Sequence, residues 1–263
     1  MLSDVMEDYL KAVYVLQAEG ESPVSTSAVA EYVDKTPPTV TDMLSKLADR
    51  GLVDREPYKG VELTAEGEAV ALEVVRHHRL LEAFLADELD YDWSDVHAEA
   101  DALEHHISEE FERRVAEALG DPDVDPHGDP IPSADLEPVD EGSGLRLSEH
   151  PEGDRLVVTR VSDRDEAELE YLADAGITPG TTIVVIDVAP FGMITVRTPA
   201  GEQSLPAEVA RSIRVEDAGA TDSDEPDADG IIDDGQTAGT NDRGGDTEDT
   251  GETAETDEVG TAQ

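Results

Sequence analysis

The chain of 263 residues contains no cysteine. This absence excludes disulfides, thiolate zinc sites and iron–sulfur clusters, and it fits a reducing cytoplasm. The chain also lacks any apolar run near the roughly 20 residues of a transmembrane helix. Its N-terminus lacks the basic and apolar regions of a signal peptide. We therefore expect a cytoplasmic protein that does not interact with a membrane.

Basic residues are scarce, because 18 Lys and Arg stand against 65 Asp and Glu, for a formal net charge of -47. Only four of the positive residues are lysines. Such acidity indicates either a specific acidic function or adaptation to high salt, where surface carboxylates keep a protein hydrated. The acids are spread along the whole chain, which favours a halophilic protein. A halophilic DNA-binding domain need not look basic.

Aromatic residues make up 4% and hydrophobic residues 38% of the chain, which suffices for small cores. Apolar residues at helical spacing dominate the first part, and β-rich runs with one short helix, "DEAELEYLADAGI", follow later. The Pro-, Gly- and Asp-rich stretch at 120–144 indicates a connecting segment. We predict a mainly α protein with a winged helix domain (1–64), a helical domain (65–135), a linker (136–154), a small β-barrel (155–216) and a tail (217–263).

The tail from Asp217 onward consists of Asp, Glu, Gly, Thr and Ser with almost no large apolar residues. Such a segment cannot bury enough apolar surface to offset the entropy of the chain. We therefore expect the acidic tail to be disordered.

The first domain has the element order of a winged helix-turn-helix. "DVMEDYLKAVYVLQAE" and "STSAVAEYVD" have the pattern of two helices, and "PPTVTDMLSKLADRG" that of a third, with prolines in its first turn. "LVDREPYKGVELT" then predicts two short strands around a turn. A small, polar face on the third helix suits the major groove of double-stranded DNA. The alternative is a three-helix domain that uses its hairpin for protein contacts.

Hydroxyl groups and helix N-termini can hold DNA phosphates, whereas the third helix and the wing supply further polar contacts. The expected DNA-binding residues are Ser25, Thr26, Ser27, Thr36, Pro38, Thr39, Thr41, Asp42, Lys46 and Lys59.

Two helices of the second domain carry histidines and carboxylates at helical spacing. His78 and Glu82 are four residues apart on the first, which also carries His77. "WSDVHAEADALEHHISEEFERRVAEAL" predicts the second helix, which would place four candidate ligands on one stripe: His97, Asp101, Glu104 and His105. Imidazole and carboxylate without thiolate favour Mn²⁺ or Fe²⁺ over copper, although affinity alone would favour zinc. The alternative is a charged solvent face. His77 and His106 lie off these stripes.

The order and spacing of several motifs resemble the diphtheria toxin repressor family of metal-dependent transcriptional regulators. The motifs are "MEDYLKAVY", "PPTVTDMLSKLADRGLV", "RHHRLLEAFL", "HAEADALEHHIS" and "HGDPIPSAD". The resemblance implies a homodimer that is held by its second domain and binds a pseudo-palindromic operator. It implies a repressor of metal-uptake genes without a small-molecule substrate, and an SH3-like third domain shared with ferrous-iron transport accessory proteins.

The resemblance also implies two metal sites. His78, Glu82 and His97 match an ancillary site, to which the third domain would add Asp165 and Glu168. The primary site, which activates DNA binding, would comprise Asp8, Asp101, Glu104 and His105. Asp8 follows the manganese-type pattern, whereas Lys11 stands where a manganese-type member has glutamate. A metal that joins Asp8 to the dimerisation helices would fix the angle between DNA-binding head and dimer core.

Two other functions compete with a metal-sensing regulator. A di-metal carboxylate enzyme would carry Glu-x-x-His on paired helices, but Glu104 and His105 are adjacent and no nucleophile or phosphate loop is evident. A metal buffer or adaptor without DNA binding would fit the acidic head. We expect a regulator and not an enzyme.

Overall fold

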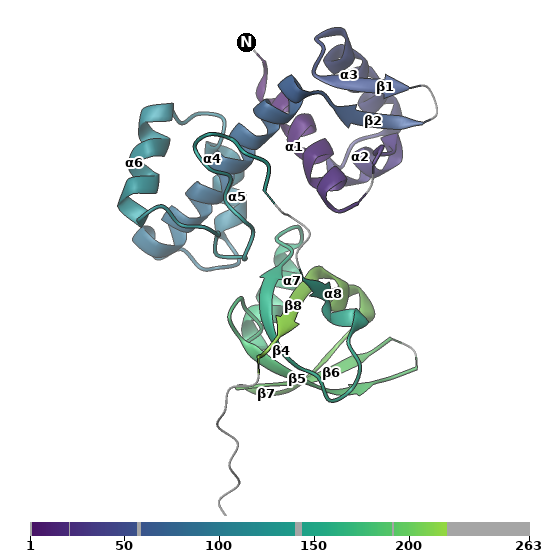
Figure 1. The fold of residues 1–263 in the computed structure, drawn as a ribbon, viewed down its shortest axis with the longest axis vertical. Coiled ribbons are helices and arrows are strands. Elements are labelled where there is room, and N and C mark those ends of the chain that lie inside the picture. The colour runs from purple at the N-terminus through teal and green to yellow at the C-terminus, as the bar shows by residue number, and fades with distance from the viewer. Residues whose placement is uncertain (1, 21, 57–58, 140–143, 191, 220–263) are drawn as a thin grey trace, which may run out of the picture. The chain divides into compact units, whose positions relative to one another are not determined.

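The computed structural model describes residues 2–20, 22–56, 59–139, 144–190 and 192–219 (Figure 1). The predicted acidic tail lies outside the described residues, apart from 217–219. No helix among the described residues is long and apolar enough to span a membrane.

The N-terminal domain contains three helices and a β-hairpin in the order expected of a winged helix (Figure 1). The elements are α1 (Asp4–Ala18), α2 (Thr26–Tyr32), α3 (Pro37–Asp49), β1 (Val53–Glu56) and β2 (Gly60–Leu63). The two strands pair antiparallel, with Val53 opposite Leu63. Apolar side chains from all three helices form one core with the hairpin and the start of the next helix.

Helix α3 lies in the domain as its sequence pattern predicts. Two prolines occupy its first turn, where the missing N–H groups would have no helical partner. Val40, Leu44 and Leu47 are fully buried, which leaves the opposite face of the helix outward. Gly51 follows the helix with a φ of 75° and allows the chain to turn into β1.

The second domain contains three helices instead of the expected two. They are α4 (Ala65–Leu89), α5 (Val96–Leu103) and α6 (Glu109–Leu119). The segment predicted as one helix breaks at 104–108, because the Ser108 hydroxyl accepts from the Phe111 N–H and starts α6. His105 therefore lies in a turn, and its expected helical relation to Asp101 is wrong.

The Pro- and Asp-rich segment after α6 is a packed loop and not the beginning of an open connection. Its backbone lies against β4 (Arg155–Val161) of the third domain, where the Val161 N–H donates to the His127 carbonyl at 2.9 Å. Gly128 has a φ of 88°, and a Cβ atom there would lie 2.0 Å from the Thr159 carbonyl oxygen. Only glycine permits this approach, so the loop and the strand are held in a fixed relation.

The third domain is an antiparallel six-stranded sheet in the order β3-β8-β4-β5-β6-β7, with α7 (Glu166–Asp174) beside it. Its other elements are β3 (Leu145–Arg146), η1 (Leu147–Glu149), β5 (Thr182–Val188), β6 (Ile194–Thr198), β7 (Gly201–Leu205), α8 (Ala207–Ser212) and β8 (Ile213–Asp217). Leu147 is fully buried in the core of this domain, which therefore begins about ten residues before the expected boundary at 155.

The close approach of Gly128 predicts a specific loss of stability in Gly128→Ala. A side chain at positive φ costs roughly 1–2 kcal/mol, and the clash with the Thr159 carbonyl adds roughly 1–3 kcal/mol of overpacking. Gly120→Ala is the matched control, because Gly120 has a φ of 79° and nothing within 4 Å of the added Cβ. Denaturant unfolding of both variants measures the difference, and equal losses would contradict the packing described.

Candidate metal centre

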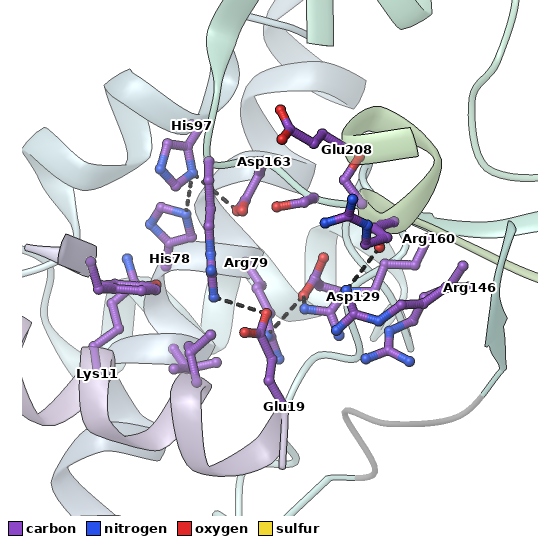
Figure 2. Close-up of a pocket in the computed structure, with 18 residues that line it drawn as sticks. Lys11, Glu19, His78, Arg79, His97, Asp129, Arg146, Arg160, Asp163 and Glu208 are labelled. Atoms are coloured by element: carbon purple, nitrogen blue, oxygen red, sulfur yellow. Dashed lines mark hydrogen bonds and ion pairs between the residues drawn. The ribbon is translucent and has the colours of Figure 1, made fainter. Parts of the chain in front are cut away.

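Glu82 lies at the centre of the buried polar groups of the second domain, and its side chain has no exposed surface. Its Oε1 atom is 3.0 Å from His78 Nε2 and 3.1 Å from His97 Nδ1. These two imidazole nitrogens lie 3.0 Å apart. Asp163 adds a second carboxylate oxygen, 3.1 Å from His97 Nδ1. Figure 2 shows His78, His97 and Asp163 converging, so helices α4 and α5 and the end of β4 contribute to one site.

The other oxygen of Glu82 faces a second cluster. Glu82 Oε2 lies 3.6 Å from His127 Nδ1, and Asp125 completes the group. All three side chains are buried, and Glu82 Oε2, His127 Nδ1 and Asp125 Oδ2 each lack a hydrogen-bond partner. Asp125 Oδ2 lies 3.8 Å from Arg79 Nε, an ion pair without a hydrogen bond. Buried polar atoms without hydrogen bonds are costly, and these three atoms together offer a cation two carboxylate oxygens and one imidazole nitrogen.

The second cluster holds His127 in the tautomer that a metal requires. His127 Nε2 lies 3.0 Å from the Trp93 carbonyl, which can only accept, so Nε2 carries the proton. Nδ1 then faces Glu82; burial lowers the pKa of His127, but the Glu82 carboxylate outweighs burial and raises it. The Asp125 Oδ1 atom accepts from the backbone N–H groups of His127 and Asp129, which fixes the loop. These are the orienting contacts that metal-bound histidines have in proteins.

Raised pKa values of side chains in both clusters reduce the net negative charge of these clusters. Burial lowers the pKa of His97, but its hydrogen bonds to Asp163 and Glu82 outweigh burial and raise the pKa to about 9. Burial raises the pKa of Asp125 well above its usual range, and the neighbouring Asp129 and Glu82 carboxylates add to this effect. His97 is therefore protonated near neutral pH, and burial favours the neutral form of Asp125.

A third cluster connects α1 with the end of α5. His105 Nε2 lies 2.7 Å from Asp8 Oδ1 and 3.3 Å from Glu104 Oε1, and His105 Nδ1 lies 2.8 Å from Glu7 Oε2. Glu104 is buried, whereas the Asp8 side chain is half exposed. This cluster therefore connects the N-terminal winged helix domain with the helical domain.

Lys11 lies between this third cluster and the Glu82-centred groups. Its Nζ atom is 2.8 Å from Glu104 Oε2 and 3.1 Å from Asp101 Oδ1. Burial disfavours its ammonium, but the Glu104 and Asp101 carboxylates more than compensate and raise the pKa of Lys11 above its usual range. His78 Nδ1 contacts the same Glu104 oxygen at 2.6 Å. The ammonium thus occupies the place where a second ion would meet His78, Asp101 and Glu104.

The structure brings together most of the predicted ligands and separates two of them. His78, Glu82 and His97 form one cluster, whereas Asp8, Glu104 and His105 form another. Asp101 leans toward His78 and Lys11. The Asp165 side chain caps α7, and Glu168 bonds to the Ser212 hydroxyl, so neither joins a cluster among the described residues.

Sequence reasoning missed Asp163, Asp125 and His127. Asp163 lies two residues after the end of β4 and two residues before Asp165, the expected third-domain ligand. Asp125 and His127 are two apart in a loop that was assigned no ligand, although histidine is scarce in this chain. His77, which lies off the predicted stripes, is buried, and its Nδ1 lies 3.1 Å from the Glu104 carbonyl, which attaches the end of α5 to α4.

The predicted DNA-binding residues lie on the surface of the N-terminal domain. All ten are exposed or half-exposed: Ser25, Thr26, Ser27, Thr36, Pro38, Thr39, Thr41, Asp42, Lys46 and Lys59. The Ser25 hydroxyl caps α2 and lies 3.1 Å from the Ser27 hydroxyl. Arg55 of the hairpin donates to Ser45 at 2.7 Å and so attaches the wing to α3.

A winged helix followed by a helical domain with buried histidine–carboxylate clusters defines a metal-responsive DNA-binding regulator. Family models match all three domains. Residues 1–61 match the N-terminal DNA binding domain of iron dependent repressors, and 64–133 match their metal binding and dimerisation domain. Residues 145–217 match the FeoA domain.

The chain belongs to the diphtheria toxin repressor family of iron- and manganese-dependent repressors. It is 35% identical over 227 residues to the iron-dependent repressor IdeR of Mycobacterium tuberculosis, a match covering 82% of this chain and 98% of the relative. It is 31% identical to the diphtheria toxin repressor of Corynebacterium diphtheriae, with coverage of 82% and 98%. A solved manganese-dependent transcriptional repressor in complex with manganese has a TM-score of 0.74 at 39% identity, covering 81% and 99%.

The protein is accordingly a metal-dependent DNA-binding transcriptional repressor with a dimerisation domain, and not an enzyme. The expected fold class, function and Mn²⁺ or Fe²⁺ cofactor class are confirmed. The imidazole and carboxylate donors described above fit either ion.

The position of Glu82 between two clusters predicts that Glu82→Gln weakens Mn²⁺ binding by roughly 100-fold or more, since even an outer-shell partner contributes 10–100-fold. The single tryptophan, Trp93, reports this binding because its ring centroid lies 5.0 Å from that of His127. We expect Mn²⁺ to change Trp93 fluorescence in the unaltered protein and in the Glu110→Gln control on exposed α6. An unchanged response in Glu82→Gln would refute the central role of Glu82.

The raised pKa of His97 predicts that metal binding releases protons. A ligating imidazole must be neutral, whereas His97 is protonated below about pH 9. Mn²⁺ affinity should rise from pH 6.5 toward 9, and calorimetry in two buffers of different ionisation enthalpy should show proton release near pH 7.5. In the metal-free protein, the contribution of His97 to the free energy of unfolding changes with pH in the opposite direction from the metal affinity. His97 stabilises the folded chain below its ordinary value near 6.5, and this contribution is lost as pH rises through about 9. Metal binding without proton release would contradict this.

Proposed function

We propose that Mn²⁺ is the principal effector of this repressor, that Fe²⁺ can replace it, and that the repressed genes encode metal uptake. The proposal places the ions in the Glu82-centred clusters and in the cluster of Asp8, Glu104 and His105. It further places the protein in the cytoplasm of a halophilic organism, which the even distribution of its acidic residues supports.

The observation that carries this proposal is the set of buried donor atoms around Glu82 that lack a hydrogen bond. They are Glu82 Oε2, Asp125 Oδ2 and His127 Nδ1, of which only Asp125 Oδ2 lies near a cationic side chain of the described chain that is not a histidine, Arg79 at 3.8 Å. The donors of the three clusters are carboxylate oxygens and imidazole nitrogens, without sulfur. Oxygen-rich sites suit Mn²⁺, and added imidazoles suit Fe²⁺ as well.

The cluster at α1 supplies a connection between metal and DNA. Asp8 belongs to the first helix of the DNA-binding domain, whereas Glu104 and His105 belong to the end of α5. A bound ion favours the arrangement of the two domains in which Asp8, Glu104 and His105 lie together. It shifts the equilibrium between arrangements only as far as it binds this one more tightly than the others. In a dimer, the two DNA-binding domains would then contact operator half-sites that lie one turn of the DNA helix, or a multiple of it, apart.

The exposed residues of α2, α3 and the hairpin are proposed to contact the operator. Thr39, Asp42 and Lys46 face outward on α3. Asp42 repels phosphate, so α3 suits base edges that donate hydrogen bonds, such as the cytosine amino group. Ser25 and Ser27 at the start of α2 suit phosphate contacts.

The test is operator binding titrated with Mn²⁺ and with Fe²⁺ under anaerobic conditions, at several KCl concentrations, on promoters of metal-uptake genes. We expect His105→Ala to abolish the metal response, since a lost ligand leaves Asp8 unconnected to α5. His106→Ala is the matched control, because His106 is adjacent, exposed and outside every cluster among the described residues.

Asp101→Ala provides the second comparison. Among the described residues, Asp101 forms ion pairs with His78, His97 and Lys11, but not with His105. Loss of the metal response in both Asp101→Ala and His105→Ala, with an intact dimer, would support a site that includes all four primary ligands. An unchanged metal response in His105→Ala would overturn the assignment of this cluster.

A further inference from the structure

His77 is a buried imidazole outside the metal clusters described above. It lies on α4 directly before His78, and its side chain is 10% exposed. It belongs to none of the metal-ligating groups among the described residues. A polar ring buried this deeply needs partners, because it has lost its hydrogen bonds to water. Its two nitrogens face different parts of the helical domain, and these contacts indicate what the ring does.

The first contact lies at the end of helix α5. His77 Nδ1 is 3.1 Å from the backbone carbonyl oxygen of Glu104, the residue that ends α5. A carbonyl oxygen only accepts, so the imidazole N–H donates. The last carbonyls of a helix have no partner within that helix, and α4 supplies the donor in this case. His77 therefore fixes the point at which α5 passes into the turn at 104–106.

The turn that His77 contacts carries two residues of the cluster at α1. The Glu104 carbonyl belongs to the planar peptide unit that joins Glu104 to His105, so its position sets the backbone of both residues. His105 Nε2 lies 3.3 Å from Glu104 Oε1 and 2.7 Å from Asp8 Oδ1. A displacement of about 1 Å is enough to loosen a site built on such distances. The contact of His77 with this peptide unit therefore bears directly on how the cluster is arranged.

The second contact of His77 reaches helix α6. His77 Nε2 lies 3.4 Å from Glu112 Oε2, without a hydrogen bond. The other Glu112 oxygen accepts from Arg76 Nε at 2.5 Å, and the Arg76 guanidinium also donates to the Pro132 carbonyl at 2.5 Å. Two successive side chains of α4 thus hold the start of α6 and the turn before it. Through His77, the position of this turn depends on how α4 packs against α6.

We propose that His77 is a positioning residue of the metal response, which holds the turn that presents Glu104 and His105 to an ion. This role rests on the proposed metal site of Asp8, Glu104 and His105, and it extends that site to a side chain that does not touch the ion. Orienting partners of this kind contribute 10–100-fold to metal affinity. Without the His77 N–H, the Glu104 carbonyl loses its donor, and the turn must be ordered when the ion binds.

A purely structural role for His77 would have a different signature, because general destabilisation of the helical domain would weaken all its metal clusters. The Glu82-centred clusters depend on other contacts. Their His127 is held by the Asp125 carboxylate and the Trp93 carbonyl, neither of which belongs to the turn after α5. We therefore expect the loss of His77 to affect mainly the cluster at α1. The fluorescence of Trp93 reports the other clusters separately.

The experiment titrates Mn²⁺ into the full-length protein and follows free Mn²⁺ by electron paramagnetic resonance and Trp93 fluorescence in the same samples. We expect His105→Ala to remove the component of binding that belongs to the cluster at α1. His77→Ala should weaken this same component roughly 10–100-fold and change the midpoint of the Trp93 response by about twofold or less. In a His105→Ala background, His77→Ala should change the binding isotherm no further, because both substitutions act on one site.

Two amide variants separate the Nδ1 contact from the size and polarity of the ring. Asn places its amide N–H near the position of Nδ1, whereas the longer Gln side chain places it near Nε2. His77→Asn should therefore keep Mn²⁺ affinity within about threefold, and His77→Gln should bind as weakly as His77→Ala. The matched control is His106→Ala, which removes an exposed imidazole from the same turn and should leave both readouts unchanged.

An unchanged isotherm in His105→Ala would contradict the proposed metal site, and the role of His77 with it. Where His105→Ala does lose its component, equal affinity in His77→Ala and the unaltered protein would overturn the role of His77 alone. Equal shifts of the isotherm and of the Trp93 response would overturn it too, because they indicate general destabilisation. Far-UV circular dichroism checks the fold. If His77→Ala does not fold, the comparison of His77→Asn with His77→Gln decides, and equal affinities there would contradict the proposal.

Discussion

The structure depends on one buried carboxylate, that of Glu82. A buried charge is tolerated only when it is paired and hydrogen-bonded. Its Oε1 atom faces two histidines, and its Oε2 atom faces a third. These partners come from α4 itself, from α5, and from a loop whose close approach to β4 depends on Gly128. The second and third domains are therefore held together around a group that requires positive charge, whether from protons or from a divalent ion.

The same carboxylate begins a continuous series of polar contacts that ends at α1. His78 joins Glu82 through one ring nitrogen and Glu104 through the other. Glu104 then contacts His105, which contacts Asp8. Each step is 3.3 Å or shorter. A change of charge at Glu82 alters the preferred protonation of the next residue in the series, and so on toward Asp8. A repressor with two states requires such coupling between its metal site and its DNA-binding domain. Lys11 adds a positive charge beside Glu104, in the middle of this series, and this charge does not depend on the metal concentration.

Much of this architecture follows from local sequence patterns. The i, i+4 spacing of His78 and Glu82 places them on one face of any helix, and the proline and glycine positions around α3 delimit a recognition-type helix. Asp163 was not predictable in this way, because its relation to His97 exists only after two domains pack. The break between α5 and α6 was missed because "EHHISEEF" continues a helical pattern, while the Ser108 cap that ends it is a single hydroxyl. Strand β7, "GEQSL", is too polar to be recognised without its neighbours in the sheet.

The distribution of charge imposes a further constraint on how this protein acts. Ordinary DNA-binding domains gain affinity from counterion release, which requires many contacts between basic residues and phosphate. Here the recognition helix exposes Asp42 and Lys46, while seven basic residues line a cavity between the helical domain and the third domain. In concentrated salt, counterion release contributes little, so the head loses little by having few basic residues. Among these residues Arg79 is buried, and a buried charge is screened by salt less than a surface charge. The chain therefore gathers part of its scarce positive charge at the junction of the metal-binding core with the third domain.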